Sequence, residues 1–393
     1  MRKLSFLRRG AHFGNIAGAL FLALLCADGF AVESGTAVAD DEDTATYFWK
    51  ADVASGDWND PANWTSSAGG ENDRYPNGAK CAVNFKNAPA EVTVSLNGIF
   101  SAKQLTMGKN GISVKLQGAN TNDSKLVTTA GFSGTQNSTF TLDAAYLQAN
   151  GLGFYQGMTF TLDHAAFFKT SSETAIKNTG ARLNIRNESV FFQEDWCVRM
   201  SRADAKVVID NGTFMFSPGR GNQDMDLAFE NSSPDDVNTV EFYGDHPRLL
   251  TGFYGVRAGS DMIGDKLGKG AVPLLVFHVP AGGYTQTPVV HTGALNQRFA
   301  GLRRQKVGIV VADDSPCFAA RAKTACKLVE WQQKIDAEYI EFREPAKTGF
   351  SMFYTYGWEG GASTDATLPL SDGDLPTAIW MSSRPVGMII SIR

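Results

Sequence analysis

The feature that most constrains the fold is an internal repeat in the middle of the chain. Segments Ala181–Phe192 and Ala205–Phe216 align without a gap at an offset of 24 residues, and both alternate apolar with polar positions. Segments Ser138–Asp143 and Met158–Asp163 share the sequence TFTLD at a spacing of 20 residues. Alternating strands that recur every 20–26 residues or so are typical of a chain that winds turn upon turn. The repeat therefore predicts a β-solenoid.

The alignment also predicts which side chains face the interior. Successive side chains of a strand point to opposite faces, so every second position of the repeat would form an apolar column. One column contains Phe140, Phe160, Leu183, Val207 and Val240, and the next contains Leu142, Leu162, Ile185, Ile209 and Phe242. We therefore expect an all-β protein with a right-handed parallel β-helix over residues 91–263. An antiparallel sandwich with similarly spaced strands is the alternative.

The rhythm becomes less regular after residue 264. Leu274–Val279 and Val307–Val311 are expected to be strands. Residues 264–393 would form either further coils or a small β domain. In both cases they would cap the solenoid, because an open last coil presents unpaired N–H and C=O groups.

The N-terminus has the pattern of a secretion signal. Four basic residues precede an apolar run at Ile16–Leu25, which is short for a membrane span. We expect residues 1–31 to be a signal peptide cleaved after Ala31, with an uncleaved membrane anchor as the alternative. Residues 32–46 are small and acidic and are expected to be a disordered leader. The mature chain would be secreted or on the cell surface, without a transmembrane segment.

Charge narrows the possible partners. The chain has a formal net charge of −5, and removal of residues 1–31 takes away four basic groups and one acidic group. The acidic mature chain argues against binding to nucleic acid or to anionic membranes.

Four cysteines remain after signal cleavage: Cys81, Cys197, Cys317 and Cys326. An even number permits disulfides in an oxidising compartment, with three possible connectivities. Cys317 and Cys326 are only nine residues apart and are the favoured local pair. The cysteine and histidine spacings do not suggest a zinc site, and we expect no cofactor.

Residues 47–90 form a second distinctive region, an expected N-terminal cap. Trp58, Trp64 and Tyr75 lie in a turn-rich stretch between two short predicted strands. Aromatic rings of this kind would form a platform on which sugar rings stack. The alternative is that the rings plug the first coil and shield its interior from water.

The order of residues in this region resembles a known arrangement. Trp49, the run Gly56-Asp-Trp-Asn-Asp-Pro-Ala-Asn-Trp64, Pro76 and Phe85 follow a signal peptide and precede β repeats. This resembles the opening of bacterial secreted and surface β-helix proteins of the autotransporter-associated β-strand-repeat type. The resemblance covers roughly residues 47–250. It implies an extracellular β-helix with a structural, adhesive or glycan-contacting role.

One outward column of the repeat carries charge. Asp143, Asp163, Arg186 and Asp210 occupy equivalent positions. Adjacent coils lie about 4.8 Å apart, so Arg186 would form a salt-bridge ladder with its two carboxylate neighbours. Asp143 and Asp163 have no cation between them and are candidates for calcium, which prefers oxygen ligands. A solvated charged face is the alternative.

The nearest approach to a catalytic group is Glu194, Asp195 and Arg199. A β-helix lyase or hydrolase needs paired acids, or an acid with a basic group, in an outer groove. These residues lie in a turn-rich segment without a distinguishing spacing. Our first hypothesis is a non-enzymatic structural or adhesive protein whose partners are extracellular polysaccharide or other surface proteins. The second is a carbohydrate-active enzyme of the β-helix type.

Overall fold

The computed structural model describes the repeat region almost completely and the C-terminal region in pieces. The described residues are 44–68, 74–202, 204–217, 226–229, 237–250, 255–258, 272–287, 289–290, 307–319, 324–331, 340–343, 350–356 and 378–385. The predicted signal peptide at 1–31 lies outside them, as does the predicted leader at 32–46 up to residue 43.

Among the described residues the protein is all-β, apart from the short helices η1 (Pro61–Asn63) and α2 (Pro316–Ala319). Its strands form three long sheets and one small one. Sheet A contains, in spatial order, β3 (Trp64–Ser66), β1 (Thr46–Trp49), β4 (Ala82–Asn84), β7 (Gln104–Thr106), β10 (Phe132–Ser133), β13 (Leu152–Gly153), β16 (Thr174–Ile176), β19 (Val198–Met200), β22 (Asp226–Phe229) and β25 (Gly255–Ala258). Sheet B contains β2 (Ser55–Asp57), β5 (Glu91–Leu96), β8 (Ser113–Gly118), β11 (Thr139–Asp143), β14 (Thr159–Asp163), β17 (Arg182–Arg186), β20 (Lys206–Asp210), β23 (Thr239–Tyr243), β26 (Leu274–Phe277), β28 (Val307–Val311) and β30 (Ile340–Arg343). Sheet C contains β6 (Ile99–Ala102), β9 (Lys125–Thr128), β12 (Tyr146–Ala149), β15 (Phe167–Thr170), β18 (Val190–Gln193), β21 (Thr213–Phe216) and β24 (Arg248–Leu250).

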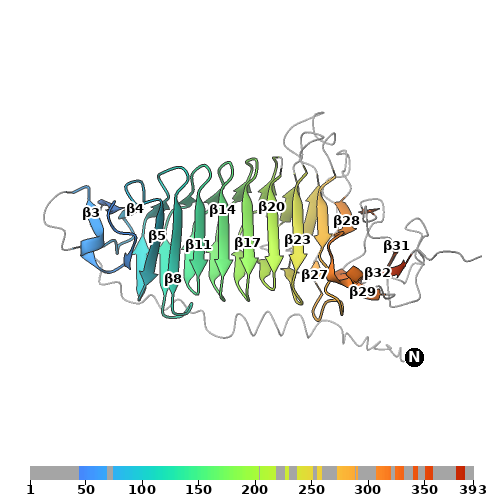
Figure 1. The fold of residues 1–393 in the computed structure, drawn as a ribbon. Coiled ribbons are helices and arrows are strands. Elements are labelled where there is room, and N and C mark those ends of the chain that lie inside the picture. The colour runs from blue at the N-terminus through green and yellow to red at the C-terminus, as the bar shows by residue number, and fades with distance from the viewer. Residues whose placement is uncertain are drawn as a thin grey trace, which may run out of the picture. The chain divides into compact units, whose positions relative to one another are not determined.

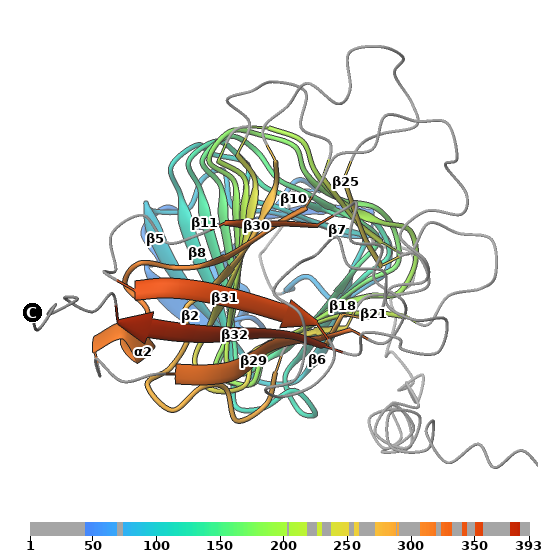
Figure 2. The ribbon, with the colours of Figure 1, turned by 90° about the vertical axis from the view of Figure 1, so that its right-hand side faces the viewer.

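The chain visits the three long sheets in a fixed cycle. From β5 to β25, each circuit adds one strand to sheet B, one to sheet C and one to sheet A, so neighbours within a sheet differ by three in strand number. The strands of sheet B lie side by side in chain order (Figure 1). The end-on view shows strands of all three sheets around one interior (Figure 2). Every described pairing between β5 and β25 is parallel, which excludes the antiparallel sandwich for this region.

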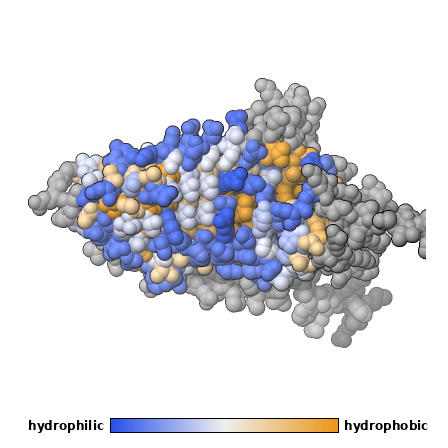
Figure 3. Space-filling view, viewed as in Figure 1, coloured by the Kyte–Doolittle hydropathy of each residue, from blue (hydrophilic) through white to orange (hydrophobic). Residues whose placement is uncertain are grey.

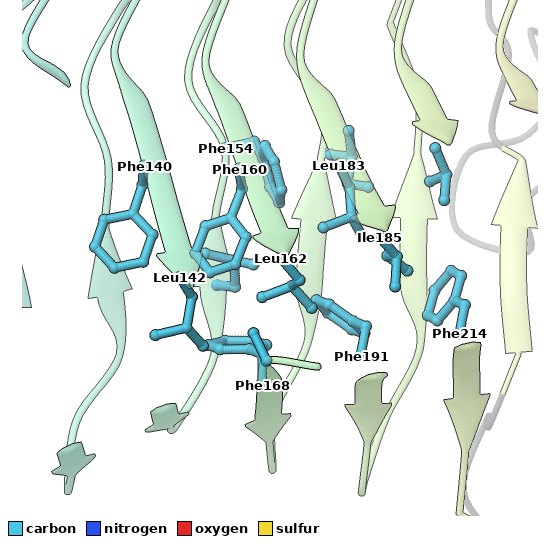
Figure 4. Close-up of a cluster of buried hydrophobic side chains, with 14 of the residues drawn as sticks. Phe140, Leu142, Phe154, Phe160, Leu162, Phe168, Leu183, Ile185, Phe191 and Phe214 are labelled. Atoms are coloured by element: carbon cyan, nitrogen blue, oxygen red, sulfur yellow. The ribbon is translucent and has the colours of Figure 1, made fainter. Parts of the chain in front are cut away.

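Both predicted apolar columns are confirmed. Leu162 pairs with Ile185, which pairs with Ile209, in neighbouring strands of sheet B. The ten column residues are all fully buried, with 0% of each side chain exposed. Rings from the other two sheets meet these columns in the interior, as Phe160 does with Phe168 of sheet C at a centroid distance of 5.1 Å (Figure 4). The stacked columns therefore form one continuous core.

The corner between sheets B and C explains how the chain turns so sharply. Residues in the left-handed backbone region recur there in successive circuits, at Ala144, His164, Asn187, Asn211 and Gly244. Asn and Gly adopt this conformation at the least cost, because L side chains generally clash with the following carbonyl. Asn211 also accepts hydrogen bonds through Oδ1 from the backbone N–H groups of the next corner, at 2.7 and 3.2 Å.

The C-terminal region combines both arrangements anticipated for it. Strands β26, β28 and β30 continue sheet B in parallel. The small sheet D contains β27 (Val289–Val290), β29 (Thr324–Trp331), β32 (Ala378–Pro385) and β31 (Phe350–Tyr356). Its β29–β32 and β31–β32 pairs are antiparallel, in contrast to the circuits before it.

The predicted disulfide between Cys317 and Cys326 is not formed. The four cysteines of the described residues are buried, and none of them forms a disulfide. Burial raises the pKa of Cys317 to about 11 and that of Cys326 to about 12, with Cys317 adding to the latter. Short sequence spacing does not supply the specific Cβ and sulfur geometry that a disulfide needs. Here both residues contribute to the apolar core instead.

Candidate functional site

The Trp module occupies the N-terminal end of the core. Trp58 and Trp64 have no exposed surface, and their ring centroids are 5.1 Å apart. Trp58 Nε1 donates to the Pro76 carbonyl at 2.7 Å, and Trp64 Nε1 donates to the Trp58 carbonyl at 2.8 Å. Tyr75 is half-buried and packs edge-on against Phe100 at 6.0 Å. A sugar platform needs an exposed ring face, and neither indole offers one, so this geometry is that of a plug.

The polar residues of the Trp motif serve the loop itself. Asp60 caps η1 by accepting a hydrogen bond from the Ala62 N–H at 2.9 Å. Asn63 Nδ2 donates to the Asp57 carbonyl at 2.9 Å. Gly56 lies directly beneath the Asn63 side chain, where a Cβ would collide with it. The polar residues of the motif therefore form hydrogen bonds within the loop, and these hold the rings in place.

The outward acidic column has the predicted register but not the predicted ion pairs. Asp143 lies beside Asp163, and Arg186 beside Asp210. The Asp143 carboxylate pairs with Lys115 Nζ and with His164 Nδ1, the latter at 2.9 Å. Because Arg186 is exposed and has no ion pair among the described residues, the Arg186 ladder is not formed.

The proposed calcium ligands already have partners in the protein. Asp163 Oδ1 accepts from Asn187 Nδ2 at 2.7 Å, and Asp143 has the Lys115 ammonium as its counter-ion. Within the described ranges, no group of three or more His, Cys, Asp or Glu residues is arranged to hold a metal ion.

The three catalytic candidates have different partners among the described residues. Glu194 Oε1 pairs with Lys169 Nζ at 2.7 Å, next to sheet C. Arg199 is an outward residue of β19 in sheet A, and its Nε lies 3.1 Å from Cys197 Sγ. Asp195 Oδ1 accepts from the backbone N–H of Trp196 at 2.9 Å. Each of the three residues therefore has a contact of its own within the described part of the chain.

The outer face of sheet C is a feature that the sequence did not reveal. Its outward residues alternate with the buried Phe100, Leu126, Leu147, Phe168, Phe191, Phe214 and Leu249. We call this set the sheet C strip: Ile99, Ser101, Lys125, Val127, Tyr146, Gln148, Phe167, Lys169, Val190, Phe192, Thr213, Met215, Arg248 and Leu250. More than half of these residues are apolar or aromatic, although they face away from the core.

Three aromatic rings lie in the middle of the sheet C strip. Tyr146 and Phe167 stack with centroids 5.6 Å apart and an interplanar angle of 13°. Phe167 and Phe192 meet edge to face at 6.4 Å. Lys125 Nζ lies 5.9 Å from the Tyr146 ring centroid, and the Tyr146 hydroxyl donates to Gln148 Oε1 at 3.0 Å. Tyr146 is buried, with 6% of its surface exposed, whereas Phe167 and Phe192 are half-buried. The two phenylalanine rings therefore provide the accessible part of this aromatic row, and Tyr146 packs behind Phe167 with Lys125 beside it.

The electrostatics of the strip reflect this packing. Burial by neighbouring side chains, with a smaller effect of the Glu194 carboxylate, raises the pKa of Tyr146 to about 12. The phenol is therefore a neutral hydrogen-bonding group at physiological pH. Ile99, at the N-terminal end of the strip, is 62% exposed.

Sheet B has a different outer face. Its middle strands present blue and near-white residues, and orange hydrophobic residues appear toward both ends of the coloured region (Figure 3). Val208, Leu274 and Val276 are half-buried outward residues of its later strands. The run of outward aromatic rings on neighbouring strands is thus found on sheet C and not along the middle strands of sheet B.

A second group that the sequence did not predict lies on sheet B; we call it the polar cluster. Glu241 pairs with Lys206 Nζ through Oε1 at 2.6 Å and accepts from the Tyr243 hydroxyl through Oε2 at 2.9 Å. The Tyr243 ring stacks on His278 at a centroid distance of 3.7 Å, and His278 Nδ1 lies 2.9 Å from Asp314 Oδ1. Burial, the Glu241 carboxylate and its hydrogen bond raise the pKa of Tyr243. Burial lowers the pKa of His278, against the opposing effect of Asp314.

Comparison with protein-family models, with curated proteins and with solved structures gives no match to this chain. In the part of the chain that the structure describes, no helix has the length and apolar character required to cross a membrane.

Proposed function

We propose that this chain is a secreted or cell-surface parallel β-helix protein with a structural or adhesive role, and that it contacts extracellular polysaccharide. The three-sheet cycle supports the β-helix, since seven circuits from β5 to β25 place each strand beside its counterpart in the next. A connection that leaves a strand and returns parallel beside it is right-handed in nearly all proteins, which supports a right-handed helix.

The sheet C strip is the observation that carries the adhesive role. A solenoid holds its outward side chains at a fixed spacing along a rigid axis, and this suits contact with long partners. Apolar patches of this size on a protein surface commonly mark interaction sites. The basic residues and apolar run at the N-terminus support export, which would bring the strip into contact with extracellular polymers.

The polar cluster favours a second candidate function, a carbohydrate-active enzyme of the β-helix type. The Tyr243 phenol contacts both the Glu241 carboxylate and the His278 imidazole. Groups of these types carry protons in acid–base catalysis.

Cell fractionation and a glycan panel test the proposal together. The tagged full chain expressed in a bacterial host should appear in the medium or on the surface, and the purified protein should retain at least one polysaccharide of the panel. The same panel is scored for ultraviolet-absorbing unsaturated products. Product formation that is lost in Tyr243→Phe would favour the enzyme. An intracellular protein that retains no polysaccharide would contradict the proposed function.

A further inference from the structure

We infer that the sheet C strip binds an extended anionic polysaccharide, carboxylated or sulfated, which lies along the direction in which the strands stack. The inference rests on the proposed function and specifies the surface and the class of ligand.

The shape of the strip favours a polymer. Seven strands about 4.8 Å apart give a strip roughly 30 Å long, with two outward positions per strand. Sites for small molecules are concave and enclose most of the ligand, whereas the outer face of a sheet is open. A linear polymer would contact several strands at once, so weak contacts to single units would add up through effective concentration.

The chemistry of the strip suits sugar rings. Phe167 and Phe192 are half-buried outward rings, and such rings pack against the apolar C–H faces of sugars. Tyr146 is buried and stacks on Phe167, which holds that ring in place. Gln148 and the lysines lie among these rings and are able to hydrogen-bond hydroxyl groups. The combination of apolar rings and interspersed polar groups matches a polyhydroxylated chain better than it matches a purely apolar partner.

The charge of the strip selects an anionic polymer. Lys125, Lys169 and Arg248 belong to the strip, and Glu194 at its margin pairs with Lys169. In the described part of the chain Lys125 has no carboxylate partner, and its ammonium lies near the Tyr146 ring. Glu194 balances Lys169, so Lys125 is the strip cation on which the attraction of an anion rests, on a chain whose formal net charge is −5. An anionic polymer would be attracted here and repelled by most other surfaces.

A second copy of the chain fits the strip less well. A strip roughly 30 Å by 10 Å presents about 300 Å², against the roughly 800 Å² per partner of a stable interface. Two strips facing each other would also bring like charges together.

The test measures binding of dextran sulfate, polygalacturonate and uncharged dextran to the purified mature chain by affinity electrophoresis. Lys125→Glu and Phe167→Ser alter the strip, and Lys125→Gln is a milder form of the first. Arg182→Glu and Val208→Ser are matched controls, because Arg182 is exposed and Val208 half-buried on the outer face of sheet B. Circular dichroism checks that each variant is folded.

The wild type should bind the two anionic polymers and not dextran, and added salt should weaken this binding through screening. Each strip variant should lower the affinity about tenfold or more, which corresponds to one decade in Kd, while the two controls stay within about twofold. Losses of equal size in Arg182→Glu would overturn the inference, as would equal binding of dextran. Binding to phosphatidylglycerol vesicles in preference to the polymers would overturn it too, as would dimerisation lost only in the strip variants.

The two proposals fail in different ways. If anionic polysaccharide binds but the strip variants bind as well as the wild type, the inference is wrong and the proposed function stands. If the chain stays inside the cell and retains none of the polymers, both are wrong.

Discussion

The stacked core makes a quantitative prediction at Phe160. This side chain is fully buried and contacts four other rings, at centroid distances of 5.0 Å to Phe140, 5.1 Å to Phe168, 5.4 Å to Phe132 and 6.2 Å to Phe154. Burial of the ring contributes about 3 kcal/mol, and edge or offset ring pairs add about 0.5–1.5 kcal/mol each. The pairs share one ring and are not additive, so we expect Phe160→Ala to cost about 4 kcal/mol, within the usual range for such cavities.

Equilibrium unfolding in urea, followed by circular dichroism, measures this cost. Phe167→Ala is the matched control. Phe167 lies on β15, the next strand after β14 in the same circuit, but its side chain faces outward and is half-buried. Its loss should be roughly half that of Phe160→Ala or less, in proportion to the area removed from water. A loss below about 1 kcal/mol for Phe160→Ala, or an equal loss in both variants, would refute the assignment of the interior.

Two further predictions concern backbone contact and pH. In Gly212→Ala the new Cβ would lie 2.5 Å from the Ile185 carbonyl oxygen of the previous circuit, so we expect a loss of about 1–3 kcal/mol in urea unfolding. Gly153→Ala, with open space around the Cβ, should change stability by less than about 0.5 kcal/mol, and equal effects would contradict the close approach. Burial lowers the pKa of His278, so the stabilisation it provides is present above its ordinary value and is lost as pH falls through the lowered value. Between pH 7 and pH 4 the free energy of unfolding should therefore fall less steeply in His278→Phe than in the wild type. An unchanged slope would contradict the lowered pKa of His278.

The interior was predictable because the repeat encodes it directly. Phe160, Leu183 and Val207 occur at the same place in successive repeats, and one register of parallel strands buries them all. Register matters here because a slip by one residue would turn each apolar side chain outward. The alignment therefore carried information about contacts between residues more than 20 positions apart.

The sheet C strip was not predictable in the same way. Tyr146 precedes the buried Leu147, and Phe167 precedes the buried Phe168, so both outward and inward positions are apolar. A run of apolar residues without alternation has the pattern of a strand covered on both faces. The sequence gives no sign that one of these faces is open.

Side-chain ion pairs between different circuits were also not predictable from the sequence. Asp143 takes Lys115 of the preceding circuit as its partner, although the repeat had aligned Asp143 only with later residues. His278 meets Asp314, from a segment with no counterpart in the repeat. Ion pairs depend on the rotamers of long side chains, and register alone does not determine these.

The outer face of sheet C is difficult to explain as a structural requirement. The core columns already supply the apolar interior, and β-strands of one sheet pair through their backbones whatever their outward side chains are. Sheet B shows this, because Thr141 and Thr161 are polar outward residues and their strands nevertheless pair in register. Tyr146 and Phe167 occupy equivalent positions on sheet C, and Phe192 lies diagonally across from Phe167. Outward aromatic residues of this kind are not needed for strand pairing. Contact with a partner is the physical reason that would retain them, and it makes the strip the first place to look for one.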